Sequence, residues 1–205
     1  YTIAIDGEQD FESVSQQVDI LQNRDIQNIS FRLTPKRKPI SKPKAINVEN
    51  AAVPKKVLDM YDAALALSMV GDHKAAVEQL KLAVAEFPAF MLAYTEMGVQ
   101  YLRLNELEKA DEALQVALKI RPDAYEPLVN RGIVMFRLKR FTEAETFLRS
   151  ALKAKEQSAV AHFYLGRTFA SQKQYDTAER EFNRAIKIGG DQMKEAHRML
   201  ASMFL

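Results

Sequence analysis

Histidine, cysteine and paired carboxylates are the side chains that most often carry acid–base, nucleophilic or metal chemistry in proteins. This chain of 205 residues contains no cysteine and three histidines, His73, His162 and His197. No two of these histidines have the spacing of metal ligands on one helix, and no glycine-rich loop follows a predicted strand to hold a phosphate. We therefore expect no catalytic residue, no cofactor, no metal site and no enzymatic activity.

A pattern of 34 residues recurs four times in the C-terminal three-quarters of the chain. One position of the pattern holds alanine in every copy: Ala76, Ala110, Ala144 and Ala178. Twelve residues earlier, each copy has another small residue: Ala64, Gly98, Gly132 and Gly166. A fixed period of this length is typical of stacked repeats built from pairs of helices.

Each copy is predicted to form two amphipathic helices, because apolar residues recur at helical spacing, as at Met60, Ala64 and Leu67. Small residues are expected where two helices approach closely, and Gly71 and Asn105 are expected in the turns between the helices of a pair. His73 and His162 stand at positions that are mostly apolar in the other copies. We therefore expect both side chains to pack against neighbouring helices.

The repeat resembles the tetratricopeptide repeat over about residues 54–190, and the second copy shows the pattern most fully. Its matching residues are Tyr94, Met97, Gly98, Tyr101, Ala110, Leu114, Ala117 and Pro122. The resemblance implies a mainly α fold, a right-handed superhelix of four helix pairs over residues 54–190, with residues 191–205 as a C-terminal capping helix. Departures from the pattern, expected to loosen local packing without changing the fold, are Arg131, Glu156, His162 and Gly190.

The family resemblance also implies a function, because the first helix of each repeat lines the concave face of the superhelix. We expect a non-enzymatic protein–protein interaction scaffold that binds a peptide or a partner helix in this groove. The residues predicted to line it are Leu58, Tyr61, Leu65, Leu92, Thr95, Val99, Leu102, Arg103, Glu126, Val129, Ile133, Phe136, Arg137, Val160, Phe163 and Arg167. Alternatively, part of this apolar set is buried between repeats.

Some family members bind a partner's terminal carboxylate with a clamp of lysine and asparagine side chains. The corresponding positions here are Tyr61, Leu65, Glu96, Glu126 and Asn130, so the basic clamp is absent. Arg103, Arg137 and Arg167 remain available to contact acidic groups of a partner.

Residues 1–34 have a different period, in which apolar residues alternate over Tyr1–Ile5, Val14–Ile20 and Ile29–Leu33. Alternation predicts three short strands and a small β module. Residues Tyr1-Thr2-Ile3, Asp10-Phe11, Val18-Asp19-Ile20 and Leu33-Thr34-Pro35 resemble the last part of a carboxypeptidase regulatory-like domain, a β-sandwich common in bacterial cell-envelope proteins. The resemblance implies that the chain begins inside such a domain, and it favours an extracytoplasmic bacterial location.

An incomplete sheet has an open edge that can pair with another copy of the chain. The alternative function is therefore a structural or self-assembly module that forms homodimers through the N-terminal strands and the groove.

Residues 35–53 are predicted to be a basic linker, since Pro35, Pro39 and Pro43 alternate with lysine and arginine. This stretch is either a docking strip for an acidic surface or nucleic acid, or a solvated spacer. The net charge of +2 and the lack of aromatic residues between the bases favour the spacer, so we expect no nucleic-acid partner. No apolar run reaches the length of a membrane span.

Overall fold

The computed structural model describes residues 2–5, 14–17 and 53–203, and the chain divides into two units, Tyr1–Ala52 and Val53–Leu205. In the first unit, strands β1 (Thr2–Ile5) and β2 (Val14–Gln17) form an antiparallel pair with Ile5 opposite Val14. The predicted third strand at 29–33 and residues 35–52 of the predicted linker lie outside the described residues.

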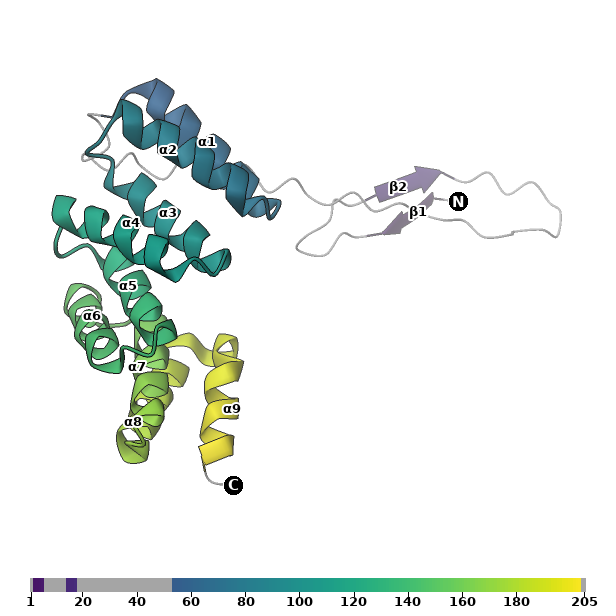
Figure 1. Cartoon of the computed structure of the whole chain (residues 1–205). Coiled ribbons are helices and arrows are strands. Elements are labelled where there is room, and N and C mark those ends of the chain that lie inside the picture. The colour runs from purple at the N-terminus through teal and green to yellow at the C-terminus, as the bar shows by residue number, and fades with distance from the viewer. Residues whose placement is uncertain (1, 6–13, 18–52, 204–205) are drawn as a thin grey trace. The chain divides into compact units, whose positions relative to one another are not determined.

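The second unit consists of four helix pairs followed by a 3-10 turn and one further helix in its described part, as Figure 1 shows from α1 to α9. The elements are α1 (Lys55–Met69), α2 (His73–Glu86), α3 (Met91–Arg103), α4 (Leu107–Ile120), α5 (Tyr125–Arg137), α6 (Phe141–Ala154), α7 (Ala159–Ser171), α8 (Tyr175–Gly189), η2 (Gly190–Met193) and α9 (Lys194–Met203).

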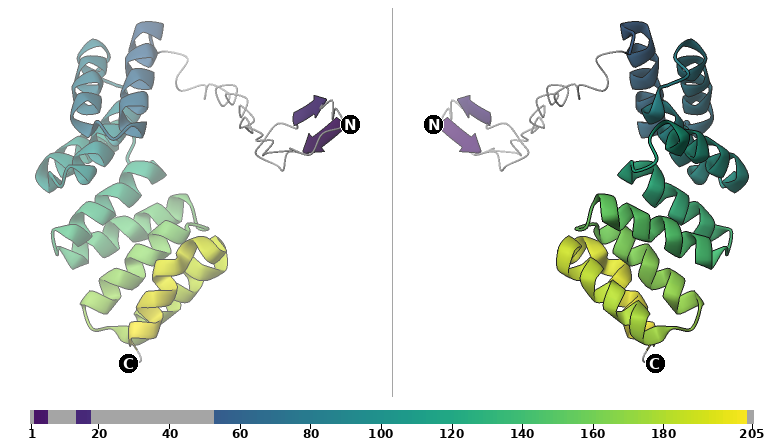
Figure 2. Two further views of the ribbon diagram at one scale, coloured as in Figure 1. Left: turned by 90° about the vertical axis from the view of Figure 1, so that its right-hand side faces the viewer. Right: turned by 90° about the vertical axis from the view of Figure 1, so that its left-hand side faces the viewer.

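Each helix packs against the next one along the chain, and the first helices of neighbouring pairs also meet, α3 with α5 and α5 with α7. The two side views in Figure 2 show the pairs stacked one above the next. The first helices therefore form one wall of the array and the second helices form the other. The predicted mainly α superhelix of helix pairs is confirmed.

The recurring glycines mark the places where the helices of a pair come closest. A Cβ atom on Gly98 would lie 2.5 Å from Cγ of Leu114, and one on Gly132 would lie 2.6 Å from Cγ of Leu148. Both leucines are fully buried. Because such contacts are far shorter than a normal carbon–carbon approach, the close packing of each pair depends on the missing side chain.

The turn inside each pair places one residue in the left-handed conformation, at the same repeat position each time. Gly71 has φ of 85°, and the equivalent Asn105, Lys139 and Lys173 have φ of 60–62°. The amide of the residue that follows bonds to a carbonyl in the last turn of the helix before, as from Asp72 to Leu67 (3.0 Å). This pattern closes each first helix and sends the chain back along it.

Helix α9, the helix predicted to act as a cap, packs against α8 and η2. Ala196 is fully buried, and Met193, Met199, Leu200 and Met203 are half-buried against the core of the last two pairs. The opposite face of α9 carries exposed residues such as Lys194 and Arg198. One face of α9 therefore covers the core of the last two pairs while the other meets water.

Two departures from the repeat pattern, Arg131 and His162, have polar partners. Arg131 Nε donates to Asp111 Oδ1 at 2.6 Å, and its guanidinium carbon lies 4.4 Å from the centre of the Phe147 ring. His162 Nδ1 lies 2.6 Å from Glu181 Oε2 in a buried pair. Both interactions replace the apolar contact that the repeat pattern usually makes.

The other two departures lie in connecting segments, where side-chain packing is less demanding. Glu156 is exposed in the loop between α6 and α7, and Gly190 has φ of 54° where α8 ends. Proline, which the repeat pattern has there, cannot adopt this backbone conformation, so glycine suits the turn into η2.

His73, which was predicted to pack, also makes a side-chain hydrogen bond to a neighbouring helix. It is half-buried, and its Nδ1 lies 2.8 Å from Oε1 of the fully buried Gln100. The Gln100 amide in turn donates to Ser68 Oγ at 2.8 Å. These bonds connect α1, α2 and α3 through side chains, and they satisfy an amide that would otherwise be costly to bury.

Candidate partner-binding groove

A hollow of about 500 Å³ lies along the wall formed by the first helices. Its lining comes from α3, α5 and α7. The residues are Val99, Leu102, Arg103, Ile133, Phe136, Arg137, Tyr164 and Arg167. We call this hollow the groove; apart from Tyr164, every residue that lines it belongs to the predicted set.

Arg167 lies among aromatic rings in the groove. Its guanidinium carbon is 4.6 Å from the centre of the Phe136 ring, 5.4 Å from that of Tyr164 and 5.6 Å from that of Phe163. The rings also contact one another, Phe136 and Tyr164 with their centres 5.9 Å apart. Cation–π contacts of this kind hold the guanidinium in place and leave its N–H groups free to bond elsewhere.

Arg137 is held by polar contacts across to the preceding helix pair. Its Nη1 donates to the Leu102 carbonyl at 2.7 Å, and its Nη2 donates to Asn105 Oδ1 at 2.7 Å. Arg103, at the end of α3, is exposed. Three positive charges therefore line one hollow together with the aliphatic side chains of Val99 and Ile133.

In the first two repeats, the structure places predicted groove residues between helices. Leu58, Tyr61 and Leu92 are half-buried and pack against the core of the first pairs. The Tyr61 ring lies with its centre 5.3 Å from that of Phe90, and burial, with smaller contributions from Glu96 and Asp62, raises the pKa of Tyr61 to about 12. These side chains fit the alternative of burial between repeats.

Five further residues of the predicted set lie outside the hollow or are closed to solvent. Thr95 is buried, with its hydroxyl donating to the Met91 carbonyl at 2.9 Å, and Val129 is buried in the core. Leu65 is half-buried, whereas Glu126 and Val160 lie at the starts of α5 and α7 and are both exposed. The remaining member, Phe163, is half-buried beneath Arg167.

Tyr164 lines the groove but was not predicted to do so. It occupies the repeat position of Glu96 and Asn130, which corresponds to a carboxylate-clamp position of the family. Its spacing of three residues from Arg167 places the two side chains on one face of α7. The spacing of Tyr164 from Arg167 was the feature of the sequence from which its place in the groove could have been predicted.

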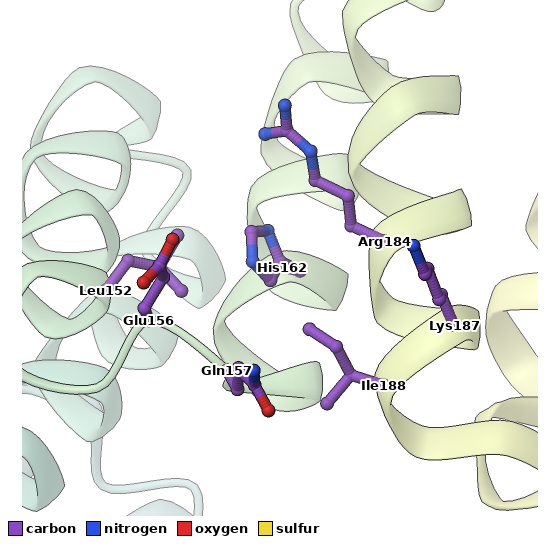
Figure 3. Close-up of a pocket in the computed structure, with 7 residues that line it drawn as sticks. All are labelled: Leu152, Glu156, Gln157, His162, Arg184, Lys187 and Ile188. Atoms are coloured by element: carbon purple, nitrogen blue, oxygen red, sulfur yellow. The ribbon is translucent and has the colours of Figure 1, made fainter.

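A second hollow, of about 640 Å³, lies between the end of α6, the start of α7 and the end of α8. Figure 3 shows His162 between the loop that carries Glu156 and Gln157 and the α8 side chains Arg184, Lys187 and Ile188. Glu181 bonds to His162 and accepts from Arg184 Nη1 at 2.9 Å. Two polar lining residues, His162 and Arg184, are thus bonded to Glu181, which suits a structural role.

The electrostatics of Glu181 agree with this role. Burial raises the pKa of its carboxyl, but the hydrogen bond and charge of His162, together with Arg184 and Arg149, outweigh burial and leave the pKa below its ordinary value. The carboxylate is therefore stabilised in its charged form inside the fold.

Within the described ranges, no cluster of three or more histidine, aspartate or glutamate side chains could hold a metal ion. None of the helices that the structure describes is both long enough and apolar enough to cross a membrane.

Comparison with known proteins places the chain in a family. Two tetratricopeptide repeat models match it, one over residues 95–159 and the other over residues 135–203. Together with the stacked helix pairs, these matches show that the chain belongs to the tetratricopeptide repeat family. The fold is that of a protein–protein interaction scaffold, whose partners are proteins. Neither model extends to the N-terminal strands, so their resemblance to a carboxypeptidase regulatory-like domain stays a prediction.

Solved structures with this fold include MamA from Desulfovibrio magneticus and TTC0263, a tetratricopeptide repeat protein from Thermus thermophilus. The chain is 20% identical to that MamA, with a TM-score of 0.66 and coverage of 74% of this chain and 85% of MamA. It is 22% identical to TTC0263, with a TM-score of 0.63 and coverage of 76% and 86%. At these identities the likeness concerns the fold. No curated protein matches the chain.

Proposed function

We propose that this protein binds a peptide or a helix of a partner protein in the groove between α3, α5 and α7. The observation that carries the proposal is the groove itself, in which aliphatic, aromatic and guanidinium groups are half-buried or exposed on three adjacent helices. Because the helices are rigid and already packed, a partner can bind there without the cost of ordering the scaffold.

Replacing Val99 and Ile133 by aspartate together is expected to reduce partner capture by the full chain at least about tenfold. Both side chains line the groove, and the substitutions remove the apolar surface on which a partner would pack and put charged groups in its place. Capture is measured by quantitative mass spectrometry of proteins retained by the immobilised wild-type and variant chains, with circular dichroism to check that helicity is unchanged.

The matched control carries the same two charges on the other wall of the array. Leu82 and Ile120 are exposed apolar residues of the second helices α2 and α4, and the variant Leu82→Asp/Ile120→Asp should retain the partner. If every protein captured by the wild type is captured equally by Val99→Asp/Ile133→Asp, the groove is not the binding site.

One observation favours the alternative, homodimer formation through the N-terminal strands. In the described part of the first unit, β1 and β2 have four residues each and pair as two strands, and a pair alone is marginally stable unless further strands or another surface cover it. A second copy of the chain could supply such strands by edge pairing.

The solution mass separates the two functions. If the scaffold proposal holds, light scattering should give about one chain mass, 23.3 kDa, for the full protein. A mass near twice that value, which returns to one chain mass when residues 1–52 are removed, would favour the self-assembly module instead. Removal is feasible because the helix array has its own buried core within Val53–Leu205.

A further inference from the structure

The groove holds three arginines that no acidic side chain is bonded to in the described part of the chain. Arg103, Arg137 and Arg167 come from α3, α5 and α7 and line the same hollow. The ion pairs of the array lie elsewhere, for example Arg140 with Glu143 on α6 and Arg198 with Glu195 on α9. Three like charges in one hollow repel each other unless an anion joins them.

Two of the three arginines, Arg137 and Arg167, are also held in place before any partner arrives. The rings of Phe136, Phe163 and Tyr164 contact the guanidinium of Arg167. These ring contacts do not use its N–H groups as hydrogen-bond donors to oxygen or nitrogen. Arg137 is fixed through Nη1 and Nη2, which leaves Nε–H and the second hydrogens of those nitrogens. A guanidinium with a fixed position and free N–H groups is suited to a carboxylate, which accepts two parallel bonds.

The acidic side chain nearest to these positions in the repeat does not neutralise them. Glu96, one turn before Val99 on α3, accepts a hydrogen bond from the Gln100 amide. In the third and fourth repeats, Asn130 and Tyr164 replace this acid. The charge of the groove at α5 and α7 is therefore positive.

Aliphatic side chains lie in the same hollow beside the guanidinium groups. Val99, Leu102 and Ile133 are half-buried, so each exposes some apolar surface to a partner. A ligand that only carried charge would leave this surface in water, and one that was only apolar would leave the arginines without an anion.

We propose that the groove recognises an acidic peptide segment, in which aspartate or glutamate side chains stand next to aliphatic ones. The carboxylates bond to Arg103 and Arg167, with Arg137 adding charge, and the aliphatic side chains pack on Val99 and Ile133. This inference rests on the proposed function and specifies the chemistry of the partner.

The probe is a display library of random peptides of roughly 12 residues, selected on the immobilised full chain. We expect the enriched peptides to contain at least about twice as much aspartate and glutamate next to leucine, isoleucine or valine as the unselected library. The leading peptide is then synthesised with its acids intact and with each acid replaced by its amide. Fluorescence anisotropy should show the acidic form binding at least about tenfold more tightly, a difference of about 1.4 kcal/mol.

Two variants assign that preference to the groove. Arg103→Gln/Arg167→Gln should lose the preference for the acidic form, while Arg180→Gln/Arg198→Gln, with the same change in net charge on α8 and α9 outside the groove, should keep it. Because Arg167 contacts three rings, the single variant Arg103→Gln at an exposed position is measured as well, and it should weaken binding of the acidic form at least about threefold.

Each other outcome overturns a defined part of the inference. Equal affinity for the acidic and amide forms, together with loss of binding in Val99→Asp/Ile133→Asp, overturns carboxylate recognition and leaves groove binding in place. Peptides that bind equally to Val99→Asp/Ile133→Asp, or a library from which nothing is enriched, overturn the proposed function and this inference together.

Discussion

Replacing Leu80 by alanine is expected to lower the free energy of unfolding of the helix array by about 2–5 kcal/mol. Leu80 is fully buried in α2 and belongs to the core that α1, α2 and α3 share. The substitution removes apolar atoms from that core and leaves a cavity that the packed helices can fill only in part. The measurement is denaturant unfolding of the full chain followed by circular dichroism.

The chain offers a matched control in the same helix. Leu82, two residues further along α2, is 51% exposed, so Leu82→Ala should change the free energy of unfolding by less than about 0.5 kcal/mol. The two substitutions remove the same atoms from the same helix, and helix propensity favours alanine equally at both positions. Similar losses for the two variants would show that α2 does not bury the face that the structure assigns to the core.

The periodic part of the fold could be predicted from the sequence because the repeat adds the same signal four times. Helices α3, α5 and α7 begin at Met91, Tyr125 and Ala159, so the first helices recur with the same period of 34 residues as the sequence pattern. Small residues at fixed spacing indicate where helices meet, and Gly98 shows why, since a side chain there would overlap Leu114. Such signals are local and recur, so they survive differences between the copies.

Polar pairing could not be predicted in the same way. His162 and Arg131 each looked like a misfit in one copy, because their partners, Glu181 and Asp111, lie on other helices. The repeat period says which positions share an environment, but it does not say which charged pair replaces an apolar contact. Lys139 shows the same limit in a turn, because lysine carries no signal for the left-handed conformation that it adopts.

Only part of the residue set predicted to line a groove faces the hollow, because other members of the set are buried. Seven predicted residues line the hollow, but Thr95 and Val129, four residues before Val99 and Ile133, are buried. On α3 and α5, the row of side chains that faces the hollow is therefore partly exposed toward the C-terminal end of the helix and buried nearer its start. The sequence pattern defines this row, whereas the stacking of the pairs decides how much of it remains open.

The pair of His162 and Glu181 is the polar feature whose loss should cost the array most. Its two side chains are about nine-tenths buried, and the carboxylate also accepts from Arg184. Removing one member leaves the other buried with fewer partners, and this costs more free energy than replacing both members by apolar residues. His162→Ala is therefore expected to lower the free energy of unfolding by about 3 kcal/mol near pH 7.

Glu181→Gln should lower the free energy of unfolding by about 1–3 kcal/mol near pH 7 and should also change its dependence on pH. Because the pKa of Glu181 is lowered in the folded protein, its carboxylate stabilises the fold above the ordinary glutamate pKa of 4.5 and loses this effect as the pH falls through the folded pKa. Unfolding measured between about pH 6 and pH 3 should thus show a smaller loss of stability on acidification in Glu181→Gln than in the wild type.

Glu195, whose carboxylate accepts from Arg198 at the same 2.9 Å and the same sequence spacing but at the surface, provides the control. Glu195→Gln should change stability by less than about 0.5 kcal/mol, and an equal effect of the two substitutions would contradict a special role for the buried carboxylate.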